Sequence, residues 1–119
     1  MEQKVDFNLI VSIINKGHCG TVIDASRSAG AEGGTIINGR GSGIHEKAKL
    51  FSFSIEPEKD IVLTLVPKEI TETVLEAIVK AVNLNEPGNG IAFIIEVEKT
   101  AGINHPVQLP ESQNKDSNS

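Results

Sequence analysis

Three short apolar runs constrain the fold of this chain more than any other feature. They are FNLIVSII at residues 7–14, IVLTLV at residues 61–66 and IAFIIEV at residues 91–97. Each run is short for a helix and rich in β-branched residues, so each predicts a strand. Their residues are apolar at nearly every position instead of alternating with polar ones, which indicates a sheet that is covered on both faces.

Two helices are predicted between these strands. Residues 21–29 place apolar and small side chains at helical spacing, and they are followed by Gly30, a residue suited to the end of a helix. The segment KEITETVLEAIVKAV at residues 68–82 has one apolar stripe with glutamates opposite. This pattern is typical of an amphipathic helix that covers one face of a sheet.

Two further segments have strand patterns. GGTIIN at residues 33–38 is a short run with two isoleucines, and LFSFSIE at residues 50–56 alternates apolar residues with serine. Alternation of this kind predicts a strand with one buried face. The residues PEKD at 57–60 predict a turn before the strand at 61–66.

The order of these elements predicts a ferredoxin-like β-α-β-β-α-β fold, with a four-stranded antiparallel sheet and both helices on one face. Two helices cover only one face, so we expect other subunits to cover the second. The 119 residues suit a single domain, which we place at residues 1–102. The Pro-, Ser- and Asn-rich tail at residues 103–119 is expected to be disordered.

Composition excludes several classes of function. The formal net charge is −5 and the basic residues are not clustered, which argues against a nucleic-acid partner. No apolar run approaches the roughly 20 residues of a membrane-spanning helix, and the first residues lack the pattern of a signal peptide. We therefore expect a cytoplasmic protein without membrane insertion. The single cysteine, Cys19, excludes an internal disulfide, and its place in GHCG favours a helix start over a metal site.

Two glycine segments are the candidate functional features. Glycines let backbone N–H groups converge on an anion without obstruction by Cβ atoms. Both segments also fit structural roles, a hairpin end for NGRGSG and a helix-ending turn for PGNG. A Walker phosphate loop is excluded, because the Gly-Lys-Ser/Thr pattern is missing and no helix is predicted to follow. A nucleophile elbow at Ser42 is disfavoured, because it needs a strand-to-helix turn and a nearby histidine base. We assign no catalytic and no metal-binding residues; the candidate site residues are Gly39, Arg40, Gly41, Ser42, Gly88, Asn89 and Gly90.

The pairing of NGRGSG with the GNG turn before the last strand resembles the PII nitrogen-regulatory signal proteins. The resemblance extends from Phe7 to about Gly102. It implies a homotrimer with the sheets facing inward, ATP or ADP in clefts between subunits, and a mobile T-loop that contacts an enzyme, transporter or transcription regulator. It also implies that Gly39, Arg40 and Gly41 lie at the base of the T-loop, and that residues 88–90 form the phosphate-binding turn called the B-loop.

The chain departs from the family pattern at several positions. The B-loop lysine of the family is replaced by Ile91, and the C-terminal pair of arginines has no counterpart apart from Lys99 in that stretch. Loss of cations removes charge-assisted hydrogen bonds, so we expect weaker nucleotide binding or a different anion. The T-loop is expected to be short, from Gly39 to Ala48, and the chain has no tyrosine that could be uridylylated.

The resemblance implies a divergent PII-like regulator of nitrogen or carbon metabolism rather than an enzyme. No cofactor is expected to be required, and ATP or ADP is the candidate effector. Two alternatives stay open. One is a trimeric metal-tolerance protein of the CutA type, which shares this fold and for which His45 and Glu46 are the local candidates. The other is a trimeric scaffold that has lost nucleotide binding.

Overall fold

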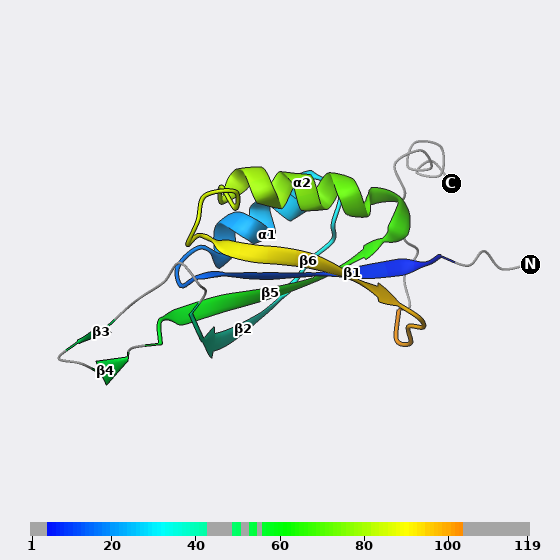
Figure 1. Cartoon of the computed structure of the whole chain (residues 1–119). Helices are drawn as coiled ribbons and strands as arrows, with labels where there is room; N and C mark the ends of the chain where they lie inside the picture. The colour runs from blue at the N-terminus through cyan, green and yellow to red at the C-terminus, as the bar shows by residue number, and fades with distance from the viewer. Residues whose placement is uncertain (1–4, 43–48, 51–52, 55, 104–119) are drawn as a thin grey trace, which may run out of the picture.

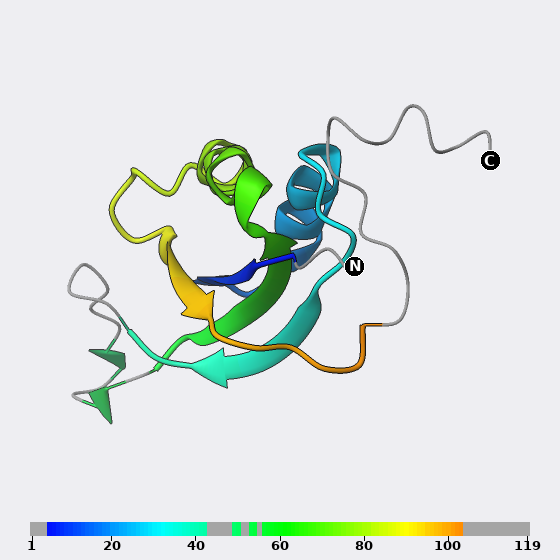
Figure 2. The same ribbon diagram turned by 90° about the vertical axis from the view of Figure 1, so that its right-hand side faces the viewer.

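The computed structural model describes residues 5–42, 49–50, 53–54 and 56–103. Within these residues, two helices cover one face of a four-stranded antiparallel sheet with the strand order β2-β5-β1-β6 (Figures 1 and 2). The ferredoxin-like β-α-β-β-α-β order is therefore confirmed. The elements are β1 (Phe7–Asn15), α1 (Cys19–Ser28), β2 (Thr35–Arg40), β5 (Glu58–Pro67), the 3-10 turn η1 (Lys68–Ile70), α2 (Thr71–Ala81) and β6 (Gly90–Val97).

The core lies between the sheet and the two helices. Antiparallel pairing of β1 with β5 sets alternate residues of both strands beneath the helices. Most of these residues are aliphatic and meet aliphatic residues of α1 and α2, so the packing excludes water. The completely buried members are Ile10, Ile14, Val22, Val62, Val66, Val74 and Ile78.

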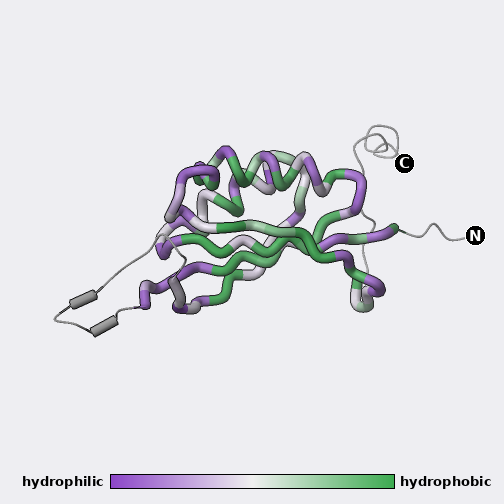
Figure 3. Tube along the Cα trace, in the orientation of Figure 1, coloured by the Kyte–Doolittle hydropathy of each residue, from purple (hydrophilic) through white to green (hydrophobic). Residues whose placement is uncertain are grey.

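The other face of the sheet is also apolar. Ile13 lies opposite Ile61 and Ile91, and the next rows toward the far end of the sheet are equally aliphatic or aromatic. Figure 3 shows that apolar residues predominate in the strands of the main sheet. In the single chain Ile91 is 57% exposed and Ile95 is 47% exposed. The second apolar face expected from the sequence is thus present, and a surface of this kind marks an interaction site.

Two sequence predictions about the connection to β5 are wrong. Residues 58–60 are not a turn, because Glu58, Lys59 and Asp60 all pair with β2 and extend β5 at its start. Pairing with two neighbouring strands overrides the turn preference of PEKD. Nor do the described residues of the predicted strand at 50–56 form one strand: β3 (Lys49–Leu50) and β4 (Phe53–Ser54) pair with each other as a separate two-stranded sheet.

The connection between β2 and β5 therefore comprises residues 41–57, and it ends later than the Ala48 boundary predicted from sequence. Its two ends are joined where Gly41 N donates to Pro57 O over 3.1 Å. Figure 1 shows β3 and β4 standing away from the main sheet. The part of the loop at residues 43–48, with His45 and Glu46, lies outside the described residues, as does the predicted tail from residue 104 onward.

Three buried hydroxyl groups differ in their hydrogen bonding. Ser12 and Thr64 are fully buried beneath the helices, and within the described part of the chain neither hydroxyl has a partner. Thr71 Oγ1, in contrast, accepts from Asn8 Nδ2 and donates to Pro67 O, each over 3.1 Å. An unpaired buried hydroxyl costs stability, whereas a paired one contributes to it.

Thr64→Val is therefore expected to leave the free energy of unfolding unchanged or raise it by about 1 kcal/mol, because it removes an unpaired hydroxyl from the core. The matched change Thr71→Val is expected to lower it by about 1–3 kcal/mol, because it strands the Asn8 amide. Urea denaturation of both variants measures the difference. Equal destabilisation by the two substitutions would contradict this account of the core.

Candidate functional site

Both glycine segments lie at the same end of the sheet. Lys59 of β5 is opposite Asn15 of β1 and opposite Gly39 of β2, and Gly90 is opposite Ile14. The β2–β5 connection and the turn between α2 and β6 therefore approach the sheet from its two edges. Side chains at this end form the candidate site.

A pocket of about 340 Å³ lies on the open face at this end. It combines the first glycine segment with the start of β6, and three isoleucines and one lysine also line it. Gly88 and Asn89 are not among its lining residues. The residues around it are Ile13, Gly39, Arg40, Gly41, Ser42, Lys59, Ile61, Gly90 and Ile91.

Close packing explains why Gly90 is a glycine. Its backbone has φ 135°, a conformation that other residues rarely adopt. A Cβ atom at this position would also collide with the carbonyl oxygen of Ile13. At Gly41, by contrast, no atom of the described residues lies within 4 Å of where its Cβ would be. Gly90 thus brings β6 against β1 beside the pocket, while Gly41 is free of this packing constraint.

Asn89 acts at the end of α2. Its Nδ2 donates to Asn83 O over 3.0 Å and to Val82 O over 3.3 Å, which satisfies carbonyl groups beyond the last turn of the helix. Asn83 itself has a positive φ of 54°. The side chain of Asn89 is therefore engaged in the helix-ending turn, the structural role that the sequence left open for this segment.

Lys59 is the site residue that sequence reasoning missed. Its side chain lines the pocket and is only 7% exposed, and its Nζ donates to Asn15 Oδ1 over 2.7 Å. A nearly buried ammonium group is costly unless it is hydrogen-bonded, so such a lysine is rarely incidental. The turn assigned to PEKD concealed it. With β5 extended to Glu58, Lys59 would stand out as a cation at the end of an apolar strand face.

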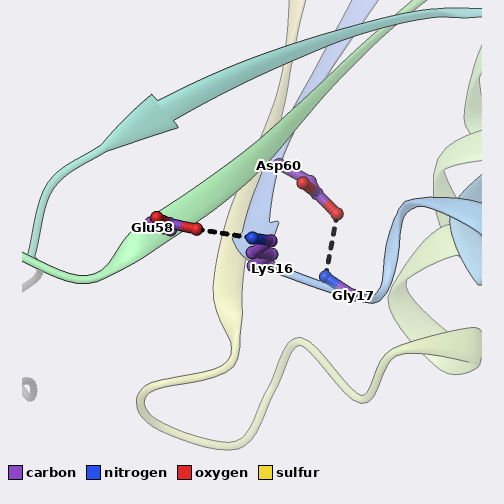
Figure 4. A network of polar contacts seen from close by, with 4 residues as sticks. All are labelled: Lys16, Gly17, Glu58 and Asp60. Carbon is purple, nitrogen blue, oxygen red and sulfur yellow. Dashed lines mark hydrogen bonds and ion pairs between the residues drawn. The ribbon is translucent and has the colours of Figure 1, made fainter.

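Arg40 lies where the pocket meets a second hollow of about 400 Å³, which Lys16, Asn38 and Glu58 also line. Arg40 and Glu58 are cross-strand partners. Lys16 Nζ lies 2.7 Å from Glu58 Oε1 (Figure 4). This ion pair is the main cause of the lowered pKa of Glu58, and the charge of Arg40 lowers that pKa further. Lys16 and Glu58 are both well exposed, so their ion pair adds little to stability.

Asp60 anchors the start of α1. Its Oδ2 accepts from Gly17 N over 3.0 Å and from Cys19 N over 3.3 Å, and Figure 4 shows the first contact. The Gly17 amide, followed by the thiol and amide of Cys19, lowers the pKa of Asp60. The hydrogen bond with Asp60 in turn raises the pKa of the Cys19 thiol. The side chain of His18 does not cap the start of α1, so the carboxylate of Asp60 in β5 takes that role.

Neither metal ligands nor a membrane span is found in the described part of the chain. No group of three or more His, Cys, Asp or Glu residues there is arranged to hold a metal ion. The described helices are also too short or too polar to cross a bilayer.

Comparison with known proteins places this fold. Residues 7–105 match the family model described as Nitrogen regulatory protein P-II. Curated protein sequences give no significant match. Among solved structures, PII from Arabidopsis thaliana bound to citrate is similar with a TM-score of 0.61, at 22% sequence identity over 79% of each chain. At this identity the structural likeness shows the fold, and the family model carries the assignment of family.

Gly90→Ala is expected to lower the free energy of unfolding by about 2–4 kcal/mol, because it combines backbone strain with a clash against β1. Gly41→Ala, whose Cβ would meet no atom of the described residues, is expected to change it by less than about 0.5 kcal/mol. Chemical denaturation of both variants measures this contrast, and a harmless Gly90→Ala would refute the packing argument.

The lowered pKa of Asp60 predicts a contribution to stability that depends on pH. A carboxyl whose pKa is lower in the folded state stabilises the fold above its unfolded pKa, near 3.9, and this contribution is lost as the pH falls through the folded pKa. Asp60→Asn should therefore be less stable than the wild type at pH 7, with a gap that narrows below about pH 4. Denaturation at several pH values measures it. The exposed Glu58→Gln is the control, and an equal effect of both would contradict the role of Asp60.

Proposed function

This chain belongs to the P-II family of nitrogen regulatory proteins, and we propose that it is a non-catalytic signalling protein whose small anionic effector binds between the subunits of a homotrimer. The observation that carries the proposal is the pocket that joins Gly39–Ser42 to Gly90 around the ammonium group of Lys59. An adenine nucleotide, ATP or ADP, is the first candidate effector, and no cofactor is required.

The composition of the pocket supports a ligand with an apolar part and an anionic part. Ile13, Ile61 and Ile91 offer apolar surface on which a base can pack, and Lys59 and Arg40 are cations beside it. Lys59 supplies positive charge that the chain lacks at position 91. Hydrogen bonds from a buried ammonium to phosphate or carboxylate oxygens are strong, which favours an anion at this place.

The open face of the sheet supports the trimer. Its apolar rows are exposed in a single chain, and burial against other copies would remove them from water. A larger hollow of about 570 Å³, separate from the one at Lys16 and Glu58, lies toward the other end of this face. It is lined in part by Phe7, Thr35, Leu63 and Leu65. In a closed ring, each interface joins two different patches of the chain, so the pocket of one subunit can meet the hollow of its neighbour.

The β2–β5 connection supports a role in binding a partner protein. It begins at the pocket with Gly41 and Ser42, and it carries β3 and β4 away from the sheet. Effector bound at its base would favour some loop conformations over others and so change the affinity for an enzyme, transporter or transcription regulator. We place this regulation in nitrogen or carbon metabolism in the cytoplasm, without nucleic-acid binding or membrane insertion.

A trimeric scaffold without nucleotide binding is the second candidate. The observation that favours it is Ile91, which is 57% exposed at the pocket where the family has a lysine. The metal-tolerance alternative has no supporting observation among the described residues.

Titration calorimetry with ATP, ADP, AMP and cyclic AMP tests the effector. We expect heat with at least one nucleotide, and at least about tenfold weaker binding by Lys59→Met, because a charge-assisted bond is lost. Lys80→Met, on the exposed side of α2, is the control and should bind as the wild type does. If no nucleotide binds, the result favours the hypothesis of a trimeric scaffold without nucleotide binding.

Light scattering in solution tests the assembly. Three copies of the 12.7 kDa chain are expected in one particle. A monomeric mass would exclude a site between subunits. It would also leave the apolar open face without its proposed cover.

A further inference from the structure

We propose that Asn15 is a positioning residue that links the buried ammonium of Lys59 to the turn between α2 and β6. Its Oδ1 accepts from Lys59 Nζ over 2.7 Å, and its Nδ2 donates to Gly88 O over 3.1 Å. One carboxamide group thus joins the cation of the pocket to the segment in which Gly88–Gly90 were predicted to hold phosphate. This inference deepens the proposed function, and the contacts on which it stands are present without a ligand.

Among the described residues, three kinds of contact fix the turn between α2 and β6 to the rest of the fold. Asn89 fastens it to the end of α2, and Gly90 packs its backbone against Ile13. Both of these contacts are internal to the fold and involve no group of the pocket that carries charge. The third contact, from Asn15 to Gly88 O, is made by a side chain that also binds Lys59. Of the three, it is the one through which a change at the ammonium can reach the turn.

A carboxamide is the side chain that this position needs. Asparagine accepts with its oxygen and donates with its nitrogen, and both groups are used here. Aspartate would accept from Lys59 but could not donate to Gly88 O, and leucine could do neither. Asn15 ends β1 directly opposite Lys59, so the strand register holds the amide between the two partners.

The consequence is a coupling within one subunit. An ammonium group has three donors, and Asn15 takes one of them. An anion that binds Lys59 alters the strength and direction of the bond to Asn15, and with it the bond from Asn15 to Gly88 O. Gly88 and Asn89 do not line the pocket, whereas Gly39–Ser42 do. Through Asn15, both glycine segments can nevertheless respond to the same effector.

Amide hydrogen exchange on the full chain without ligand tests the link. The reporter is the amide of Asn89, which donates to Glu86 O over 3.2 Å. Asn15→Leu and Lys59→Met are each expected to speed exchange there by about two- to tenfold, the range that corresponds to one net hydrogen bond. Lys59 acts on the turn only through Asn15, so this amide in the double variant should exchange no faster than in the faster single variant.

Two further variants sharpen the test. Asn15→Asp keeps the acceptor for Lys59 but cannot donate to Gly88 O, so it should speed exchange as Asn15→Leu does. Asn85→Leu changes an exposed asparagine of the same loop and should leave the exchange unchanged. The proposal is overturned if Lys59→Met leaves the turn at the wild-type rate, or if the effects of Lys59→Met and Asn15→Leu add. Because no ligand is present, such a failure is separate from any failure to bind a nucleotide.

Discussion

The structure depends on the need to cover both faces of the central strands β1 and β5. Helices α1 and α2 bury one face of these two strands, and the residues there pack as a mainly aliphatic core. The other face has the same aliphatic character, and no helix in the described part of the chain covers it, so its isoleucines stay exposed in the single chain. A small domain without tryptophan or tyrosine has little other apolar area to bury, and association is the physically direct way to gain it.

That constraint also explains where the polar groups gather. Along the open face the rows are apolar until the last one, where Gly39, Lys59 and Asn15 lie side by side. Here the sheet meets its loops, and charged groups can be hydrogen-bonded without crossing the apolar surface. Asp60 uses the opposite side of the same strand end to hold the start of α1. A short stretch of β5 therefore organises both the helix start and the candidate pocket.

The apolar strands and the two helices could be predicted because their signals are local, and the family could be predicted from two glycine motifs taken together. Val74 and Ile78 show their burial through helical spacing, and Ile10 and Ile14 belong to a run so apolar that it had to be a buried strand. The start of β5 could not be predicted in this way, since Glu58, Lys59 and Asp60 become a strand only through pairing with β2. The bond from Asn15 to Gly88 joins segments far apart in sequence. No local pattern announces such a contact, and the place of Lys59 in the pocket was hidden for the same reason.

The loop between β2 and β5 leaves and re-enters the sheet at paired residues, Arg40 and Glu58, with the bond from Gly41 N to Pro57 O just outside them. Its ends are therefore held one strand spacing apart, about 5 Å, whatever the loop does in between. The entropic cost of closing a loop rises only slowly with its length. Loop length and composition are thus free to diverge while the sheet register stays the same, so that one scaffold can acquire new partners by exchanging a single segment.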